Sequence, residues 1–161
     1  MITLRAAEQS DKEILCEVHR SSIKELCKTH YTDFELRVWY ERLYPEYYAR
    51  YINEREIFIA EKDREIIGFG QLDQRNGRIE AIYICPDYSR MKIGTELLKK
   101  LVEVAQTYGL KVLHLSSTLN AVPFYEHNGF IQKECLNYRF QEDVEISCVT
   151  MEREIDKTQS S

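Results

Sequence analysis

The pattern of hydrophobic and polar positions predicts one short strand and then helices in the first third of the chain. Residues 2–6 read as the strand. Capping-box pairs, a Ser or Thr followed three residues later by Glu, occur at 10–13 and 32–35, and each predicts the beginning of a helix. The second helix should end just before Pro45, because proline disfavours helical geometry in the residue before it. Pro45 can itself open a short helix over 45–51.

Strand and helix patterns alternate in the rest of the chain. A 3.6-residue apolar stripe predicts a helix over 93–105, with Gly109 at the C-cap position, and a shorter helix is expected over 121–127. Asn76-Gly77 is a hairpin signal. The element order, β-α-α-β-β-β-α-β-α-β-β, indicates an α/β domain with a mixed sheet. The strands are expected at 56–61, 65–73, 78–85, 111–116, 130–135 and 145–151.

Length and composition predict one ordinary globular domain. The chain has 161 residues, of which 43% are hydrophobic and 30% charged. The element pattern covers residues 2–152, and 153–161 reads as a polar C-terminal tail. No apolar run approaches the roughly 18–20 residues of a membrane span, and the N-terminus does not resemble a signal peptide. We therefore expect a cytoplasmic protein that does not act on membranes.

Cysteine usage and charge exclude further classes. The five Cys are scattered and odd in number, so reduced thiols are expected rather than a disulfide framework. The four His are too dispersed to suggest a metal site. An isoelectric point of about 5.5 argues against nucleic-acid binding.

One segment departs from the acidic average. From Ser89 to Lys100 there are four basic residues against one acid, a net charge of +3 in a chain of net charge −5. It leads from a predicted strand into a helix N-terminus, where free amides and the helix dipole favour anions. A phosphate-bearing ligand is one interpretation. A solvated basic face on an ordinary crossover is the other.

Two motifs resemble those of the GNAT N-acetyltransferase superfamily. The stretch PDYSRMKIGTELL (86–98) resembles its acyl-CoA pyrophosphate loop, [Q/R]-x-x-G-x-[G/A], and NAVPFYEHNGF (120–130) resembles its second signature, N-A-x-x-F-Y-x-x-x-G-F. The resemblance spans about 2–152. It implies an α/β fold of the α+β type, with a mixed, mostly antiparallel sheet of about six to seven strands. Helices would flank this sheet, which would splay at its central parallel pair.

The first motif departs from the family pattern at two positions. Ser89 stands where the family has Gln or Arg, and Lys92 stands where it has Gly, while Gly94 is retained. A side chain at 92 could crowd the approach of backbone to phosphate. Lys92 could instead supply charge to the phosphates, as could Arg90. This weakened loop also leaves open a non-catalytic GNAT-like domain that binds CoA as a sensor or interaction module.

The resemblance implies acetyl-CoA as co-substrate, no metal, and a reaction in which an amine attacks the thioester directly. The pantetheine arm of acetyl-CoA would pair with the backbone of one strand. Asn120 would touch the pantetheine or phosphate region, although it could also be a helix N-cap. The residues expected to bind the co-substrate are Ile82, Tyr83, Ile84, Ser89, Arg90, Met91, Lys92, Ile93, Gly94, Thr95, Asn120 and Phe124.

Two residues are the candidates for proton transfer. Tyr125 matches the tyrosine that faces the thioester sulfur, so it is the expected general acid; the alternative is that it only packs its helix. Glu80 is the expected general base. It lies two residues from Ile82 and therefore on the same face of a regular strand. The alternatives are a solvent-facing Glu80 and an ordered water as base.

The acceptor side is predicted only in outline. Six of the eleven Tyr fall between Tyr31 and Tyr51, and with Trp39 they could cradle a cationic amine or simply form core. Tyr31 and Trp39 are the candidate substrate residues. Cys85 is expected to be a packed thiol rather than a nucleophile, because no His motif accompanies it. The acceptor is expected to be a small-molecule or protein amine. A homodimer is one of the assemblies that the sequence allows.

Overall fold

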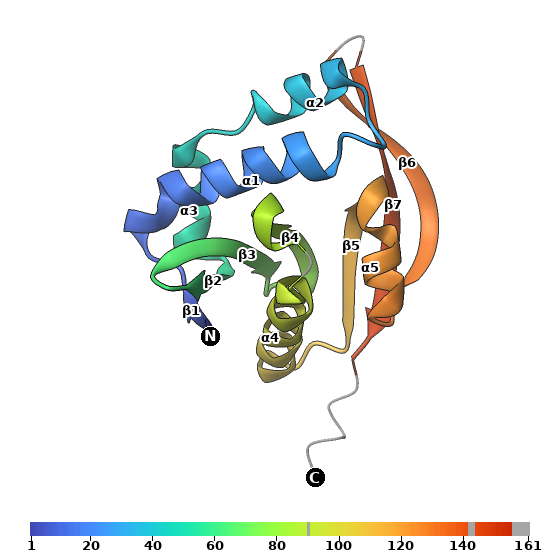
Figure 1. The fold of residues 1–161 in the computed structure, drawn as a ribbon. Helices are drawn as coiled ribbons and strands as arrows, with labels where there is room; N and C mark the ends of the chain where they lie inside the picture. The colour runs from blue at the N-terminus through green and yellow to red at the C-terminus, as the bar shows by residue number, and fades with distance from the viewer. Residues whose placement is uncertain (90, 142–143, 156–161) are drawn as a thin grey trace.

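The computed structural model describes residues 1–89, 91–141 and 144–155, and its centre is a seven-stranded sheet with the order β1-β2-β3-β4-β5-β7-β6 (Figure 1). Neighbouring strands are antiparallel except β4 and β5. This confirms the expected mixed, mostly antiparallel sheet. The strands are β1 (Ile2–Ala6), β2 (Glu56–Lys62), β3 (Glu65–Asp73), β4 (Arg78–Ile84), β5 (Val112–Thr118), β6 (Ile131–Gln141) and β7 (Val144–Glu154).

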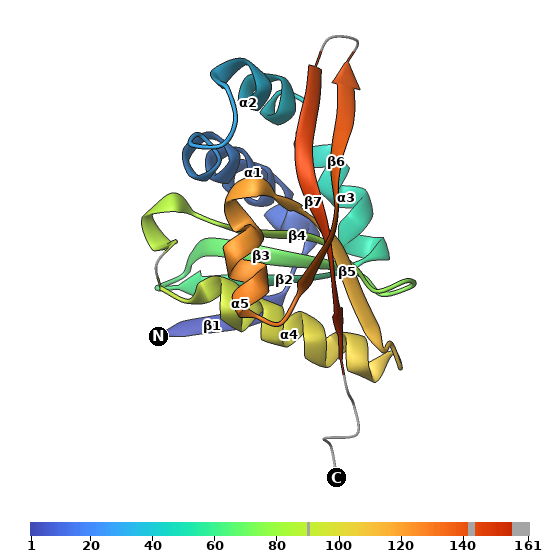
Figure 2. The ribbon, with the colours of Figure 1, turned by 90° about the vertical axis from the view of Figure 1, so that its right-hand side faces the viewer.

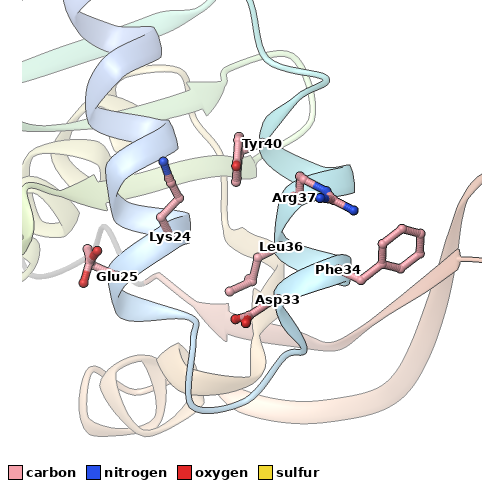
Figure 3. Close-up of a pocket in the computed structure, with 7 residues that line it drawn as sticks. All are labelled: Lys24, Glu25, Asp33, Phe34, Leu36, Arg37 and Tyr40. Carbon is pink, nitrogen blue, oxygen red and sulfur yellow. The ribbon is translucent and has the colours of Figure 1, made fainter.

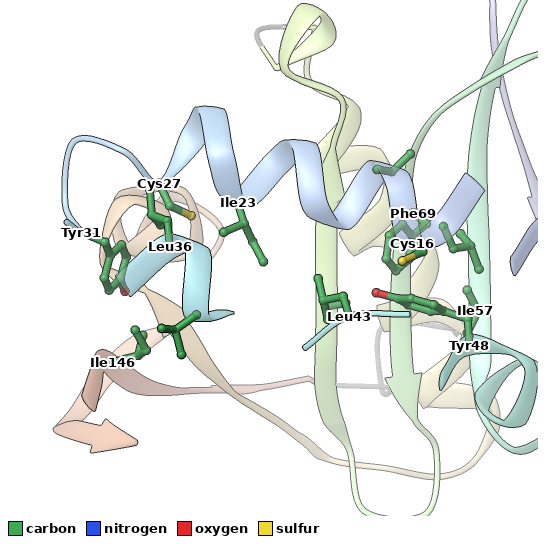
Figure 4. Close-up of a cluster of buried hydrophobic side chains, with 14 of the residues drawn as sticks. Cys16, Ile23, Cys27, Tyr31, Leu36, Leu43, Tyr48, Ile57, Phe69 and Ile146 are labelled. Atoms are coloured by element: carbon green, nitrogen blue, oxygen red, sulfur yellow. The ribbon is translucent and has the colours of Figure 1, made fainter. Parts of the chain in front are cut away.

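Helices cover both faces of the sheet. On one face α1 and α3 pack with Phe69 and Ala81, and Figure 4 shows part of this buried cluster. On the other face α4 packs with Ile79 and Leu113, and Figure 2 shows α4 and α5 on that side. The α-helices are α1 (Lys12–Leu26), α2 (Asp33–Tyr40), α3 (Pro45–Glu54), α4 (Ile93–Thr107) and α5 (Val122–His127). None of the helices that the described residues form is long and apolar enough to cross a membrane.

The two predicted capping boxes had different outcomes. Thr32 and Glu35 form one: the Thr32 amide donates to Glu35 Oε1 over 2.9 Å, and the Glu35 amide donates to Thr32 Oγ1 over 3.1 Å. The prediction of a capping box at 10–13 was wrong. Asp11 instead accepts from the Glu8 amide over 2.7 Å and from Arg5 over 2.8 Å, so a short 3-10 turn precedes α1. Because Asp11 bonds Arg5 and the Glu8 amide, the capping residue is Glu8, two residues before the predicted Ser10.

The C-terminal hairpin is longer than its sequence pattern suggests. β6 and β7 are each 11 residues, and the hairpin rises beside α2 (Figure 2). Arg153 and Glu154 pair with β5, and the Ile155 amide donates to the Lys111 carbonyl over 2.8 Å. Residues 153–155, which were expected to belong to the polar tail, are thus bonded to β5 or to the segment before it. Residues 156–161 lie outside the described part of the chain.

β4 carries a bulge at Glu80. Ala81 pairs with Gln71 while Ile79 pairs with Leu72, so Glu80 is an extra residue in its strand. Ile79 and Ile82 consequently both pack on the α4 side, whereas Ala81 packs on the α1 side. The expectation that Glu80 and Ile82 share a face was wrong, because one inserted residue exchanges the faces of everything after it.

The parallel pair at the centre of the sheet is very short. β4 and β5 pair only at Arg78 with His114 and at Ile79 with Leu115. Beyond Leu115 the two strands diverge, as the resemblance implied. The edge of β4 that faces β5 is thus free of strand partners from Glu80 onward.

His19 on α1 is a buried base beneath β4. Its ring stacks on Tyr83 with centroids 3.9 Å apart, and Nδ1 bonds the Tyr48 hydroxyl. Nε2 has no partner among the described residues. Burial lowers the pKa of His19 from 6.5 to about 3. As the pH falls through about 6.5, His19 therefore binds a proton in the unfolded chain but not in the folded chain.

This burial predicts a loss of stability in mild acid. Below pH 6.5 the unfolded state binds more protons, so the free energy of unfolding should fall by about 2 kcal/mol between pH 7 and pH 5. His19→Gln should make stability nearly constant over that range. Urea unfolding at both pH values measures this, with exposed His127→Gln as the control. An equal acid loss in His19→Gln and the control would contradict the assignment.

Candidate functional site

A cleft of about 590 Å³ lies where β4 and β5 separate. Its walls come from the end of α1, from β4, from the first turn of α4 and from the segment between β5 and α5. A slot of about 40 Å³ continues between the two strands, lined among others by Glu80, Ser116 and Tyr125. Tyr125 lines both spaces, so it stands at the junction of cleft and slot.

Nine of the residues expected to bind the co-substrate line this cleft. Ile93 does not, because its side chain is buried in the core under α4, and Met91 is an exposed residue of the loop. Arg90 lies outside the described residues. The role of these residues stays a prediction, but their convergence does not depend on the motif. The nine are Ile82, Tyr83, Ile84, Ser89, Lys92, Gly94, Thr95, Asn120 and Phe124.

The loop before α4 keeps a glycine-like backbone without the glycine. Lys92 has φ 59°, in the left-handed region, and is the N-cap of α4. Gly94 faces Phe124, and a Cβ there would lie 3.2 Å from the Phe124 ring. The first amides of this 15-residue helix therefore open onto the cleft, an arrangement suited to phosphate.

Lys92→Gly should separate the effect of backbone strain at residue 92 on stability from the effect of the lysine charge on acetyl-CoA binding. Glycine adopts φ 59° without penalty, so the free energy of unfolding should rise by about 1 kcal/mol. The backbone already has the favoured geometry, so losing the ammonium should weaken acetyl-CoA binding about 2- to 5-fold. Calorimetric titration and urea unfolding measure the two effects, with exposed Lys99→Met as the control. Tighter binding would mean that the Lys92 side chain obstructs the site.

Asn120 has the environment expected of a ligand-binding side chain. Its Oδ1 is buried and has no partner among the described residues. Ala121, not Asn120, is the N-cap of α5, so the alternative reading as a helix cap was wrong. Because Asn120 lines the cleft, a ligand there can offer this buried acceptor a donor such as an amide N–H, and the binding role of Asn120 stays a prediction.

Tyr125, the expected general acid, is buried at the junction of cleft and slot. It lies on α5, is 7% exposed, and packs against Phe124 and Phe130 with ring centroids 5.0 and 5.5 Å away. Burial raises the pKa of its phenol well above 10. The hydroxyl is therefore a neutral donor at any physiological pH.

Glu80 meets two partners that the sequence did not reveal. Its Oε1 accepts from Arg55 Nε over 3.0 Å and from Gln71 Nε2 over 2.9 Å. Arg55 Nε also lies 3.6 Å from Asp73 Oδ2. Arg55 is distant in sequence and belongs to no motif, so only the folded chain brings it here. The carboxylate of Glu80 is held at the slot.

Asp73 is the other acid of this cluster. Hydrogen bonds from Arg75, partly opposed by burial, lower the pKa of Asp73 to about 2. The Asp73 carboxylate is therefore ionised and paired with Arg75, so the closer ion pair of Arg55 is with Glu80.

The two candidate substrate residues pack together and are not among the residues that line the cleft. Tyr31 donates its hydroxyl to the Ser147 carbonyl over 2.6 Å and accepts from the Leu119 amide over 2.9 Å. Burial raises its pKa to about 12. Trp39 lies edge-on to Tyr31, 5.6 Å away. Tyr31 thus bonds the segment before α2 to β7, and Trp39 of α2 packs edge-on to Phe140 of β6. A substrate role for either residue stays a prediction.

No thiol is activated as a nucleophile at the cleft. Cys27 lines it, but burial raises its pKa to about 12. Burial also raises the pKa of Cys85, which does not line the cleft. Within the described ranges no group of three or more His, Cys, Asp or Glu is arranged to hold a metal.

A second pocket, of about 480 Å³, lies between α1 and α2 (Figure 3). Its lining carries both charges, with Lys24 and Arg37 as bases and Glu25 and Asp33 as acids. It shares no lining residue with the cleft at β4 and β5. The cleft at β4 and β5 is the better candidate, because a strand edge without a strand partner, a helix N-terminus and Tyr125 meet there and, of the described residues, none of these features lines the second pocket.

Comparison with known proteins agrees with this geometry. The sequence model of the family described as "Acetyltransferase (GNAT) domain" matches residues 27–155. The chain belongs to the GNAT acetyltransferase family. An uncharacterized N-acetyltransferase of Methanocaldococcus jannaschii is 25% identical over 119 residues, 65% of this chain and 53% of that protein. The chain thus spans about half the length of this GNAT relative.

Solved GNAT structures share the fold over nearly the whole chain. A GCN5-related N-acetyltransferase from Rhodopseudomonas palustris superposes with a TM-score of 0.89 at 22% identity, covering 94% of each chain. The PaiA N-acetyltransferase of Thermoplasma acidophilum, in complex with coenzyme A, gives 0.79 at 26% identity, covering 96% of this chain and 99% of the other. The family assignment therefore rests on sequence and fold together.

Proposed function

We propose that this GNAT protein transfers an acetyl group from acetyl-CoA to an amine by direct attack in a ternary complex. The observation that carries the proposal is the junction of cleft and slot at Tyr125. The cleft offers a free strand edge, an orphaned Asn120 oxygen and a helix N-terminus to one elongated anionic ligand. The slot leads from it to Glu80.

In the proposed reaction Glu80 and Tyr125 handle the two protons. Glu80, directly or through a water, takes a proton from the acceptor ammonium. The freed amine nitrogen then forms a bond to the thioester carbonyl carbon. As the C–S bond breaks, Tyr125 donates its phenolic proton to the sulfur, and the acylated nitrogen gives up its second proton, which returns to the Tyr125 phenolate. The products are an amide and CoA thiol, with the tyrosine restored and the first proton on Glu80. Positioned proton transfer contributes roughly 10²- to 10⁴-fold to such rates.

Release of free thiol from acetyl-CoA with a panel of amines tests the proposal. Turnover with at least one amine, and micromolar or tighter binding of acetyl-CoA by calorimetry, is the expected result. Binding without turnover would favour the alternative, a non-catalytic CoA sensor. Neither binding nor turnover would overturn both. The expected co-substrate contacts at Lys92 depart from the family pattern, so binding should be measured first.

A further inference from the structure

We infer that the acceptor carries a carboxylate beside its amine, as a free amino acid does, and that Arg78, Ser116 and Tyr138 bind it. The inference rests on the proposed function and names the substrate class of the same site. Neither of the two GNAT motifs includes any of these three residues.

The three side chains form a connected group at the slot. Arg78 Nη2 donates to Ser116 Oγ over 3.4 Å, and Ser116 Oγ lies 3.0 Å from the Tyr138 hydroxyl. Ser116 itself lines the slot together with Glu80. Arg78 and Glu80 are two residues apart on β4, before the bulge takes effect, so they project from the same face. The group therefore adjoins the expected site of amine attack.

The charge of Arg78 is unbalanced. Within the described part of the chain, no carboxylate lies within ion-pair distance of its guanidinium, and a guanidinium has five donors, of which Ser116 engages one. Glu80 is occupied by Arg55, and Asp73 by Arg75. The side chains of Arg78 and Tyr138 are accessible to solvent, so a ligand can reach them.

A carboxylate matches this group better than a second cation does. The planar guanidinium fork pairs with the two oxygens of a carboxylate, and two hydroxyls beside it can donate to the same anion. A purely cationic acceptor would meet Arg78 as a like charge. The acceptor that fits has an amine directed to the slot and a carboxylate directed to Arg78.

Acetylation of amino acids and of their carboxamides tests the inference. The two compounds differ in charge at one group, and the amide has the more easily deprotonated amine, so intrinsic reactivity favours the amide. The native protein should nevertheless prefer the amino acid in kcat/KM by about 10-fold or more. Arg78→Met and Arg78→Gln should abolish that preference by raising KM for the acid alone. Gln retains a donor for Ser116 without the charge.

The control and the contrary outcomes are distinct. Arg139→Met removes a nearby arginine that is already paired with Glu145, and it should leave the preference unchanged. Equal or better use of amides by the native protein, or unaltered selectivity in both Arg78 variants, would overturn the inference while the acetyltransferase activity stands. Calorimetric titration of the same amino acids, with CoA present, covers the case of no turnover. Arg78-dependent binding would then support the carboxylate site and reject the proposed reaction, and no binding would reject both.

Discussion

Tyr125→Phe is expected to lower kcat by at least about 10-fold while the Kd for acetyl-CoA stays nearly unchanged. The substitution removes one hydroxyl and keeps the ring that packs against Phe124 and Phe130. Without that donor the sulfur must leave as a thiolate or take its proton from water. Because burial holds the phenol protonated, the loss should be similar across neutral and mildly alkaline pH.

Single-turnover kinetics and calorimetric titration measure these two quantities. Tyr108→Phe is the control, because Tyr108 is an exposed tyrosine beyond the end of α4 and should have no effect. An unchanged single-turnover rate in Tyr125→Phe would remove Tyr125 from the acid role. Weaker acetyl-CoA binding with a normal rate would instead make it a binding residue.

Arg55→Met should destabilise the fold by about 3 kcal/mol, the largest stability effect that we expect. The Arg55 side chain is only 7% exposed and lies between the carboxylates of Asp73 and Glu80, over the ring of Tyr51. Removing one partner of a buried ion pair leaves the other charge uncompensated, which is far more costly than losing a surface pair. Arg75 still serves Asp73, so the loss should fall mainly on Glu80.

Urea unfolding at pH 7 tests this, with Arg50→Met as the matched control. Arg50 pairs with Glu54 on the exposed face of α3, which ends just before Arg55, and such a pair contributes about 0.3–0.5 kcal/mol. Adding Glu80→Gln to Arg55→Met should recover part of the lost stability, since no charge is then left unpaired. Equal losses in Arg55→Met and Arg50→Met would show that the buried cluster contributes little.

Much of the fold follows from local sequence signals. Alternation, apolar stripes and turn residues predicted every strand and the long helix to within a few residues, apart from the length of the last hairpin. That hairpin extends to Gln141 because β6 pairs with β7 through positions with no apolar alternation of their own. Such pairing depends on the partner strand, which a local pattern does not contain.

The candidate site was predictable where it coincides with a motif and not elsewhere. Tyr125, Asn120 and the α4 loop come from contiguous segments, so their spacing identifies them. Glu80, the expected base, lines the slot but lies on the other face of β4 from Ile82, because a bulge cannot be read from one strand alone. Its role as a base stays a prediction. Arg55 and Arg78 acquire their importance from neighbours distant in the chain.

The two-residue ladder between β4 and β5 has a mechanical consequence. The sheet is in effect two half-sheets joined by a short seam at Arg78–Ile79. Among the described residues no strand pairing spans the gap beyond that seam, so widening it breaks no hydrogen bond between the two strands. A long, thin ligand can therefore enter by displacing side-chain packing alone, with the seam intact. We expect the amides of such a ligand to pair with the β4 backbone beyond the seam.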